Sequence, residues 1–453
     1  MDHDVSGVPT LNRRRLIRSA AVAAGAFSSL GVQRTGAEPA PSARLRTARR
    51  SQVRKVRLAL TTDDQPRVQP LLDQYASETG IIVEPQAFPY PDLYEDLNIN
   101  LTLGTCAYDV VSLDDPWMPL FAGQQFLTNL EELATREGVT FDREDFVPAF
   151  IALGTDPTAG LQAIPWIGNV QVYAWRQDVM QELRRDRPRT WDDVIAAATD
   201  VQAARPGGDL YGVGIRGQTG NSAATTFLPI LRGHGADVFD AGWVPQLESE
   251  QAQAAMRTLL ALAELAPPGV EEIGHEELAQ ELYTGRIAQA ADIWPNQMLQ
   301  VYDPARSTVL GKVAIGAQPA QPGVQPASMT GNWLLGIPAG CGANAREALA
   351  FALWLTAPEQ QKRLLLERGL PPTRLSVFAD PESVEKLPFL PGLVEAGMNA
   401  APRPRTLHYP AVEEILGRWV AQAISGRVSG EEALGQANQE IRGLMVREGV
   451  LRE

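Results

Sequence analysis

Two neighbouring carboxylates are the first candidates for chemistry in this chain. Asp114 and Asp115 follow the apolar run "DVVSL" and precede Trp117, in the segment "SLDDPW". A glycosidase needs two carboxyl groups about 5–9.5 Å apart, one on each side of the bond that it breaks. The side chains of adjacent residues usually point in different directions, so this pair favours ligand binding over acid/base catalysis. A secreted glycosidase that uses Asp114 or Asp115 is the enzyme alternative.

The sequence has no other recognisable catalytic or metal-binding pattern. It contains no G-x-S-x-G, P-loop, dinucleotide fingerprint or H-E-x-x-H motif. Its four histidines and two cysteines do not have the spacing of zinc ligands. We therefore expect a protein that is not an enzyme and that uses no metal and no cofactor.

Polar side chains, most of them with a tryptophan nearby, recur where strands are expected to end. The groups are Asp63 with Asp64, Asp115 with Trp117, Trp166 with Asn169, Trp294 with Asp292 and Asn296, and Asn332 with Trp333. A sugar has an apolar C–H face and a ring of hydroxyl groups, so tryptophan can stack on it while Asp and Asn accept its hydroxyl protons. The pattern favours a carbohydrate site. The alternative for each tryptophan is a place in the hydrophobic core.

The first part of the chain has the periodicity of a parallel α/β sheet. Strands and helices are expected to alternate over residues 56–60, 66–80, 81–88, 90–103 and 108–113. Such units form parallel sheets with right-handed crossovers, and ligands collect at the carboxyl ends of the strands. The loops "TTDDQP" (61–66) and "DDPW" (114–117) both lie at that edge. The last third of the chain is expected to be mostly helical.

Charge divides the chain unevenly. Residues 1–55 contain 11 Lys/Arg and 3 Asp/Glu, a net charge of +8, and since the whole chain carries −14, residues 56–453 carry −22. A body this acidic should repel nucleic acid and anionic membrane surfaces. We therefore expect no nucleic-acid partner.

The basic N-terminus has the order of an export signal. The charged "NRRRLIR" precedes the short apolar "SAAVAAGAFSSL" and the small residues "TGA". Arg13 and Arg14, followed by Leu16 and Ile17, are similar to the twin-arginine signal. We expect a signal peptide at residues 1–37, a linker at residues 38–55, and a soluble mature protein outside the cytoplasm. A disordered basic tail is the alternative.

The two cysteines leave two alternatives open. Cys106 and Cys341 could form a disulfide in an oxidising compartment, or they could be two separate buried thiols. Neither follows the apolar run of the signal, where a lipidated cysteine would have to be.

Several ordered segments together resemble the family 1 extracellular solute-binding proteins of ABC transporters, the maltodextrin-binding type. The matching segments are "YDVVSLDDPWMPLFAGQQFLTNLEEL", "GLQAIPWIGNVQVYAWRQDVM", "RTWDDVIAAAT", "ELYTGRIAQAADIWPNQ", "MTGNWLLGIP", "EALAFALWLTAPEQQKRLLLERGLPPTR" and "SGRVSGEEALGQANQEI". They extend from about residue 56 to near the C-terminus. Each segment alone is weak, whereas the ordered set is specific.

The resemblance implies a two-lobed periplasmic binding protein fold. Two α/β lobes with parallel sheets would be joined by crossing segments, with the ligand between them and closure by hinge motion. Crossings are expected near residues 166–171, 287–294 and 330–333. The first lobe would contain residues 56–166 and 288–331, and the second lobe residues 167–287 and 332–453.

The resemblance also implies which residues bind the ligand. Asn169 stands where the maltodextrin binders have a carboxylate, which implies a different ligand. Trp294 matches the stacking tryptophan of "GPW"-like motifs, and Asn332 with Trp333 matches the "GGW" segment of many sugar binders. For Arg374 a structural ion pair is the alternative. The full expected set is Asp63, Asp64, Asp114, Asp115, Trp117, Trp166, Asn169, Trp294, Asn332, Trp333, Arg374, His408 and Tyr409.

The implied function is delivery of a neutral carbohydrate to an inner-membrane ABC permease by an exported monomer. The ligand would be a mono- or oligosaccharide, a glycoside or a polyol. A polyamine is one alternative, because Asp and Trp together also hold a cation. A phosphorylated or sulfonated sugar is another, and it would need Arg216, Arg374 or a neighbouring arginine in the cleft.

Overall fold

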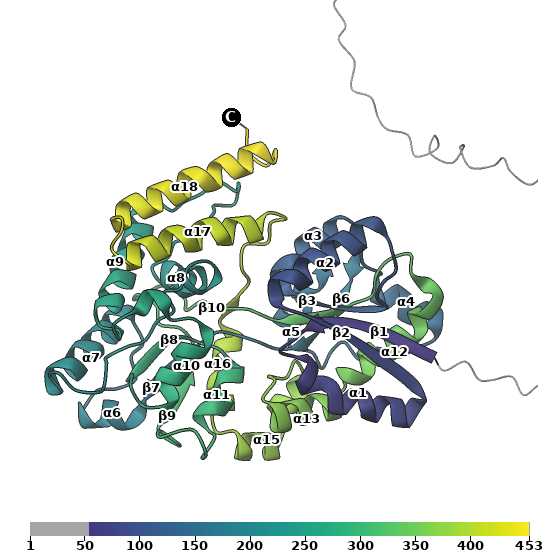
Figure 1. Ribbon diagram of the computed structural model, residues 1–453, viewed down its shortest axis with the longest axis horizontal. Helices are drawn as coiled ribbons and strands as arrows, with labels where there is room; N and C mark the ends of the chain where they lie inside the picture. The colour runs from purple at the N-terminus through teal and green to yellow at the C-terminus, as the bar shows by residue number, and fades with distance from the viewer. Residues whose placement is uncertain (1–53, 453) are drawn as a thin grey trace, which may run out of the picture. The chain divides into compact units, whose positions relative to one another are not determined.

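The computed structural model describes residues 54–452, which belong to one compact unit of the chain, Val53–Glu453. The expected signal peptide and nearly all of the linker, residues 1–53, lie outside the described residues. Among residues 54–452, no helix has the length and apolarity needed to cross a membrane. Figure 1 shows two groups of strands and helices, which we call the first and the second lobe.

The first lobe contains a five-stranded mixed sheet. Its strands lie in the order β2 (Ile81–Phe88), β1 (Arg54–Thr61), β3 (Val110–Asp114), β11 (Trp333–Gly336) and β6 (Ala163–Ile167). β1 pairs in parallel with β2 and β3, whereas β11 is antiparallel to both β3 and β6. The three strands predicted at the start of the fold are therefore confirmed, but the sheet is not parallel throughout.

Helices cover both faces of this sheet because side chains alternate across each strand. On β1, Leu58 and Leu60 face one core, and Ala59 faces the other. Gly80 ends the first helix with φ 71°, a left-handed cap that glycine adopts without steric cost. The helices of this lobe are α1 (Gln65–Thr79), α2 (Tyr90–Leu103), α3 (Met118–Gly123), α4 (Leu130–Glu137), α5 (Pro148–Leu153), α12 (Ala345–Leu355) and α13 (Pro358–Arg368), with short turns η1 (Asp115–Trp117) and η3 (Gly342–Asn344) and the hairpin β4 (Thr155–Asp156) and β5 (Gly160–Leu161).

The second lobe has a smaller sheet surrounded by helices. Its strands are antiparallel, in the order β8 (Gln289–Ile293), β7 (Val172–Arg176) and β9 (Val313–Gly316). A capping box of Thr190 and Asp193 starts α7. The helices are α6 (Gln177–Glu182), α7 (Trp191–Ala204), α8 (Asn221–Gly233), α9 (Glu250–Glu264), η2 (Val270–Glu272), α10 (His275–Tyr283), α11 (Pro295–Val301), α16 (Leu390–Met398), α17 (Tyr409–Ile424) and α18 (Gly430–Arg447).

Three segments connect the lobes. The first is residues 168–171 between β6 and β7, and the second is residues 317–332, which include β10 (Ser328–Met329). They are hydrogen-bonded to each other, from Gln171 N to Met329 O (2.9 Å) and from Gly331 N to Asn169 O (3.0 Å). The third leaves α13 through α14 (Leu375–Phe378) and α15 (Pro381–Lys386), and β12 (Ala400–Ala401), after α16, pairs with β10.

The division into lobes expected from the sequence is wrong for two parts of the chain. The sequence assigns residues 288–331 to the first lobe, but β8 and β9 both pair with β7 in the second. It assigns residues 332–453 to the second lobe, but β11, α12 and α13 belong to the first. Periodicity identifies a strand, but the sheet that it joins is decided by pairing with residues far along the chain.

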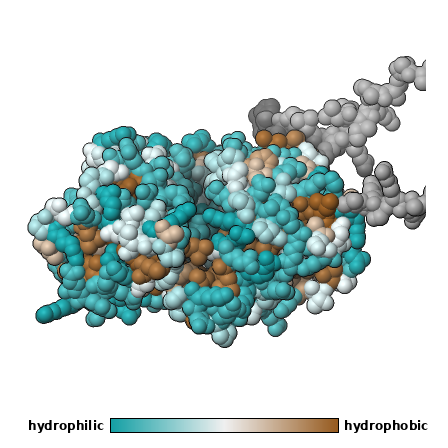
Figure 2. All heavy atoms as spheres, turned by 60° about the horizontal axis from the view of Figure 1, so that its bottom comes forward, coloured by the Kyte–Doolittle hydropathy of each residue, from teal (hydrophilic) through white to brown (hydrophobic). Residues whose placement is uncertain are grey.

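The face of this unit that Figure 2 shows is mainly polar. In the view of Figure 2, hydrophilic residues predominate and the hydrophobic ones form small separate patches. The most exposed large apolar side chains are Met398, Leu103 and Ile99. Ile99 and Leu103 lie one turn apart on α2, whereas Met398 lies on α16. Small groups of exposed apolar residues are normal on the surface of a folded protein.

A disulfide connects Cys106 to Cys341, with Cα atoms 5.4 Å apart. The sequence leaves open either a disulfide or two separate buried thiols, and the structure has the disulfide. It joins the loop after α2 to the loop after β11, 235 residues further along the chain. The bond closes a long loop, and restricting such a loop in the unfolded chain stabilises the folded state.

Reduction of this disulfide is expected to lower the free energy of unfolding by about 2–5 kcal/mol. The measurement is urea unfolding with and without a reducing agent. The variant Cys106→Ser/Cys341→Ser should have the lower stability in both conditions. If the wild-type midpoint does not change on reduction, the bond does not contribute as described.

Candidate functional site

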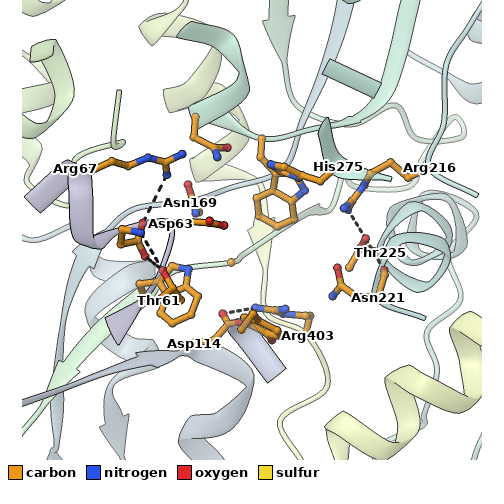
Figure 3. Close-up of a pocket in the computed structure, with 16 residues that line it drawn as sticks. Thr61, Asp63, Arg67, Asp114, Asn169, Arg216, Asn221, Thr225, His275 and Arg403 are labelled. Carbon is orange, nitrogen blue, oxygen red and sulfur yellow. Dashed lines mark hydrogen bonds and ion pairs between the residues drawn. The ribbon is translucent and has the colours of Figure 1, made fainter. Parts of the chain in front are cut away.

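A polar cavity of about 270 Å³ is lined by residues of both lobes and of the connecting segments. Figure 3 shows its side chains pointing toward one another from opposite sides. The lining residues are Thr61, Asp63, Asp64, Arg67, Tyr90, Asp114, Asn169, Arg216, Asn221, Thr225, His275, Trp294, Asn296, Gly331, Trp333 and Arg403. Three arginines and three aspartates are among them, so the charge that the cavity offers to a ligand depends on how these side chains pair.

The loop after β1 places one paired and one exposed carboxylate at the cavity. Asp64 is buried, accepts a 2.7 Å hydrogen bond from Thr61 Oγ1, and lies 3.6 Å from Arg67 Nη1. Burial raises the pKa of Asp64 above its ordinary value, while Thr61 and Arg67 oppose the shift. Asp63, the preceding residue, is exposed. The Asp64 carboxylate therefore already interacts with Thr61 and Arg67, whereas Asp63 is open to solvent.

Asp114 ends β3 and receives three hydrogen bonds. Its donors are Tyr90 OH (2.8 Å), Arg403 Nη2 (2.7 Å) and the backbone N of Asp115 (2.9 Å). Burial raises the pKa of Asp114 to about 6, although the positive charge of Arg403 opposes that shift. This carboxylate is thus held in place from α2 and from the segment that precedes α17.

Asp115 does not line the cavity but connects β3 to the second crossing segment. Its Oδ2 accepts from the backbone N of Asn332 at 2.9 Å, and its Oδ1 lies 3.3 Å from Arg403 Nη2. Asn332 in turn donates from Nδ2 to the carbonyl of Asn169 at 3.0 Å. The two adjacent carboxylates therefore have different positions, one at the cavity and one behind it.

Aromatic rings form one wall of the site. Trp117 is buried, with its ring centroid 5.2 Å from Tyr90, 5.3 Å from Tyr94 and 5.7 Å from Trp333. Trp333 and Tyr90 line the cavity, whereas Trp117 supports them from behind. Trp166 lies deeper, in the core of the first lobe, where its Nε1 donates to Ser112 Oγ at 3.0 Å.

On the opposite side, a buried ion pair is built into the second lobe. Arg216 lies 2.6 Å from Asp292, which is fully buried at the end of β8 and also accepts from Gln171 Nε2 and Thr226 Oγ1. Arg216 donates as well to Thr225 Oγ1 at 2.5 Å. The guanidinium reaches the cavity with its charge already neutralised.

Two further residues of the second lobe contribute uncharged groups. Burial and, to a smaller extent, the charge of Arg216 lower the pKa of His275 to about 4, so its imidazole is neutral near pH 7. Trp294 is buried except for its contact with the cavity, and a Cβ at Gly331 would come within 2.4 Å of its ring. The glycine therefore gives the indole its position against the second crossing segment.

Six of the thirteen residues that the sequence proposes line the cavity, and seven do not. Those that line it are Asp63, Asp64, Asp114, Asn169, Trp294 and Trp333. Asp115, Trp117 and Asn332 lie directly behind the wall, and Trp166 lies in the core.

The remaining three lie elsewhere. Arg374 is buried within the first lobe. It donates to the carbonyls of Thr356 (2.7 Å) and Asp142 (2.8 Å), and its guanidinium lies 3.6 Å from the ring centroid of Phe146. Tyr409 is buried in α17 and donates to Glu413 at 2.9 Å. His408 precedes it at the N-cap position of that helix.

The sequence did not predict most of the other residues that line the cavity. Thr61 is the first residue of the loop that it identified, and Arg67 directly follows that loop. Asn296 was noted beside Trp294, and Arg216 was named only for an anionic ligand. Arg403, in "APRPR", gave no local signal, because its partners lie 288 and 289 residues away. A local sequence signal is also lacking for five other lining residues, Tyr90, Asn221, Thr225, His275 and Gly331.

Two α/β lobes joined by crossing segments, with a polar cavity lined from both, define a periplasmic binding protein fold. Residues 59–362 match the family described as "Bacterial extracellular solute-binding protein". This is more than half of the chain, so the chain belongs to that family, as the ordered motifs predict. It is accordingly a solute-binding component of a transport system and not an enzyme.

Three known proteins illustrate the similarity. A "probable amino-acid ABC transporter periplasmic-binding protein" of Sinorhizobium fredii is 24% identical over 392 residues, covering 83% of this chain and 86% of that protein. The mannitol-binding protein of Pseudomonas aeruginosa is 25% identical over 332 residues, covering 68% and 74%. The solved structure of maltose-bound MalE3 of T. maritima has a TM-score of 0.76 and 26% identity, covering 86% of this chain and 99% of that one.

The Arg216–Asp292 pair gives a stability prediction. Arg216→Met leaves Asp292 buried without its counter-charge, which should lower the free energy of unfolding by about 3–5 kcal/mol in urea. The double variant Arg216→Met/Asp292→Leu removes the unpaired charge and should recover at least part of the loss. A single variant as stable as the wild type would contradict the proposed structural role.

Proposed function

We propose that this protein binds one small uncharged polyol or monosaccharide between its lobes and delivers it to a membrane ABC permease. The single observation that carries this proposal is the charge pairing of the cavity. Each of its three arginines has a carboxylate within 3.6 Å: Arg67 with Asp64, Arg216 with Asp292, and Arg403 with Asp114. A site built in this way offers many hydrogen-bonding groups, and Asp63 is the one lining carboxylate among the described residues that has no ion-pair partner.

This pairing argues against the two charged alternatives. An anionic sugar needs a free guanidinium, and Arg216 directs its Nε and Nη2 donors to Asp292 and Thr225. A polyamine needs several uncompensated carboxylates, but Asp64 and Asp114 already face arginines, which leaves only Asp63 unpaired among the described lining residues. Arg374, the other arginine considered for an anionic sugar, lies away from the cavity. A hydroxyl group is the partner that can both donate to a carboxylate and accept from an arginine.

The size of the cavity favours a single sugar unit or a linear polyol. Sites for drug-sized ligands usually measure about 300–1,000 Å³, and this one measures about 270 Å³. An oligosaccharide would need additional space outside it. We therefore propose a monosaccharide or a polyol, and not an oligosaccharide, as the ligand.

Individual side chains have distinct proposed roles. Trp294 and Trp333 would contact the apolar C–H face of the ligand from opposite lobes. Asp63, Asp114 and Asn169 would accept hydroxyl protons, and Asn169 Oδ1 has no hydrogen-bond partner among the described residues. Asp115, Trp117 and Asn332 would position these groups from behind.

The names of the similar proteins support the ligand class only in part. One is named for mannitol and one contains maltose, both uncharged polyhydroxy compounds, whereas the S. fredii protein is named for amino acids. The charge pairing described above favours the first class, and an amino acid is an outcome that the ligand screen can detect.

Export and assembly complete the proposal. The twin-arginine-like segment around Arg13 and Arg14 supports export of the folded protein across the inner membrane. The small, separate apolar patches on the face that Figure 2 shows support a monomer. The ligand would bind while the lobes are apart, and closure about the crossing segments would enclose it.

A thermal-shift screen of polyols, monosaccharides, amino acids and polyamines tests the ligand class. A bound ligand at 100 times its dissociation constant should stabilise the protein by about 2.7 kcal/mol. We expect a pentitol, a hexitol or a monosaccharide to raise the melting temperature. A shift with only amino acids or polyamines would contradict the proposal. Trp333→Ala should weaken the hit at least tenfold, whereas Trp419→Ala, a half-buried tryptophan away from the cavity, should leave the affinity unchanged.

Ligand affinity should also depend on pH. Asp114 has a pKa of about 6, so its charged form, the stronger hydrogen-bond acceptor, is present above that pH and is lost below it. Calorimetric titrations at pH 7.5 and 5.0 should therefore show affinity about tenfold weaker at the lower pH. Asp114→Asn has no proton to gain and should bind equally at both. Equal wild-type affinities would show that Asp114 does not contact the ligand as an anion.

A further inference from the structure

Arg403 is a cation that the chain itself supplies to the acidic end of β3. It lies between β12 and α17, and its side chain is 4% exposed. Its Nη2 is 2.7 Å from Asp114 Oδ1 and 3.3 Å from Asp115 Oδ1, as Figure 3 shows for Asp114. One guanidinium therefore serves two adjacent carboxylates.

Without that guanidinium, the same place would suit an ammonium group. Asp114 and Asp115 would be two neighbouring carboxyl groups, both nearly inaccessible to water and without the guanidinium that pairs with them. The rings of Tyr90 and Trp333 lie beside Asp114 at the cavity, and aromatic faces also attract cations. Carboxylates with aromatic rings are the combination that binds amines. The difference between a hydroxyl site and an amine site here is the side chain at position 403.

The other charges near this group do not replace Arg403. Arg405 donates to the carbonyl of Leu153 at 3.1 Å, and no hydrogen bond joins it to either aspartate. Glu413 adds a further negative charge close to Arg403 and accepts from Tyr409. Arg216 and Arg67 are committed to Asp292 and Asp64. Removal of Arg403 would leave Asp114 without a guanidinium partner among the described residues, whereas the charge of Arg405 still acts on Asp115.

Arg403 also retains unused hydrogen-bonding capacity. Its Nε is buried and has no partner among the described residues. A buried donor in a native site normally finds an acceptor, and here the residue lines the ligand cavity. An acceptor from outside the chain, such as a ligand hydroxyl, would satisfy this requirement.

We propose that Arg403 is the specificity-determining residue for ligand charge, an internal counter-ion that reserves Asp114 for hydroxyl groups and excludes ammonium ligands. The inference rests on the proposed function, because it explains how an acidic cavity selects uncharged ligands. It adds that this selectivity can be reversed at one position. Rejection of the amine has two sources: repulsion by the guanidinium, and the pairing of the Asp114 carboxylate with that guanidinium.

The test compares pairs of ligands that differ only in charge. Pentitols and hexitols, and their 1-amino-1-deoxy analogues, are titrated calorimetrically at pH 7.5 into the full-length protein and its variants. Arg403→Met removes the charge and keeps most of the apolar stem, Arg403→Lys keeps the charge, and Arg418→Met removes a paired arginine of α17 away from the cavity. The measured quantity is the ratio of the amine and polyol dissociation constants.

The wild type and Arg418→Met should bind the polyol at least tenfold more tightly than its amine analogue. Arg403→Met should reduce this ratio at least tenfold, by weaker polyol binding and tighter amine binding, and Arg403→Lys should keep it above one. If Arg403→Met does not fold, Arg403→Met/Asp115→Asn carries one carboxylate fewer and should show the same direction of change. An unchanged ratio in a folded variant overturns the role of Arg403 alone. A wild type that prefers the amines, or binds neither series, overturns the proposed function as well.

Discussion

The buried contact between Arg403 and the carboxylates of Asp114 and Asp115 is the interaction on which the rest of the site depends. It joins the end of β3 in the first lobe to the segment that leads into α17 in the second. Charges removed from water are costly unless their geometry and hydrogen bonding are nearly complete. Here Tyr90 and the backbone N of Asn332 supply additional donors to the two carboxylates. This charge cluster therefore holds together the aromatic wall of the site, the second crossing segment and the segment that precedes α17.

The same principle is repeated in the second lobe. Asp292 has Arg216, Gln171 and Thr226 as donors, and Gln171 belongs to the first crossing segment. Each lobe therefore presents to the cavity a charge pair that is connected to a crossing segment. A site made of satisfied pairs binds through exchangeable hydrogen bonds and aromatic faces, which is what an uncharged polyhydroxy ligand requires.

Local sequence information predicted the parts of this site that depend on short-range structure. The periodicity of residues 56–113 predicted β1, α1, β2, α2 and β3, and the rule that ligands collect at strand ends brought Asp63 and Asp114 to one edge. It could not tell Trp333, at the cavity, from Trp166, in the core, because both lie at or next to an end of a strand in the same sheet. Arg403 and the sheet membership of β8 and β11 depend on contacts with distant residues, for which no local pattern exists.

The central claim is that a small uncharged ligand lies between the lobes and contacts both of them. A crystal structure of the protein with the polyol or monosaccharide that gives the largest thermal shift tests it most directly. The account predicts the ligand between Trp294 and Trp333, with a hydroxyl donating to Asp114 while Arg403 remains paired with that carboxylate. A ligand bound to one lobe only, or outside this cavity, would contradict it.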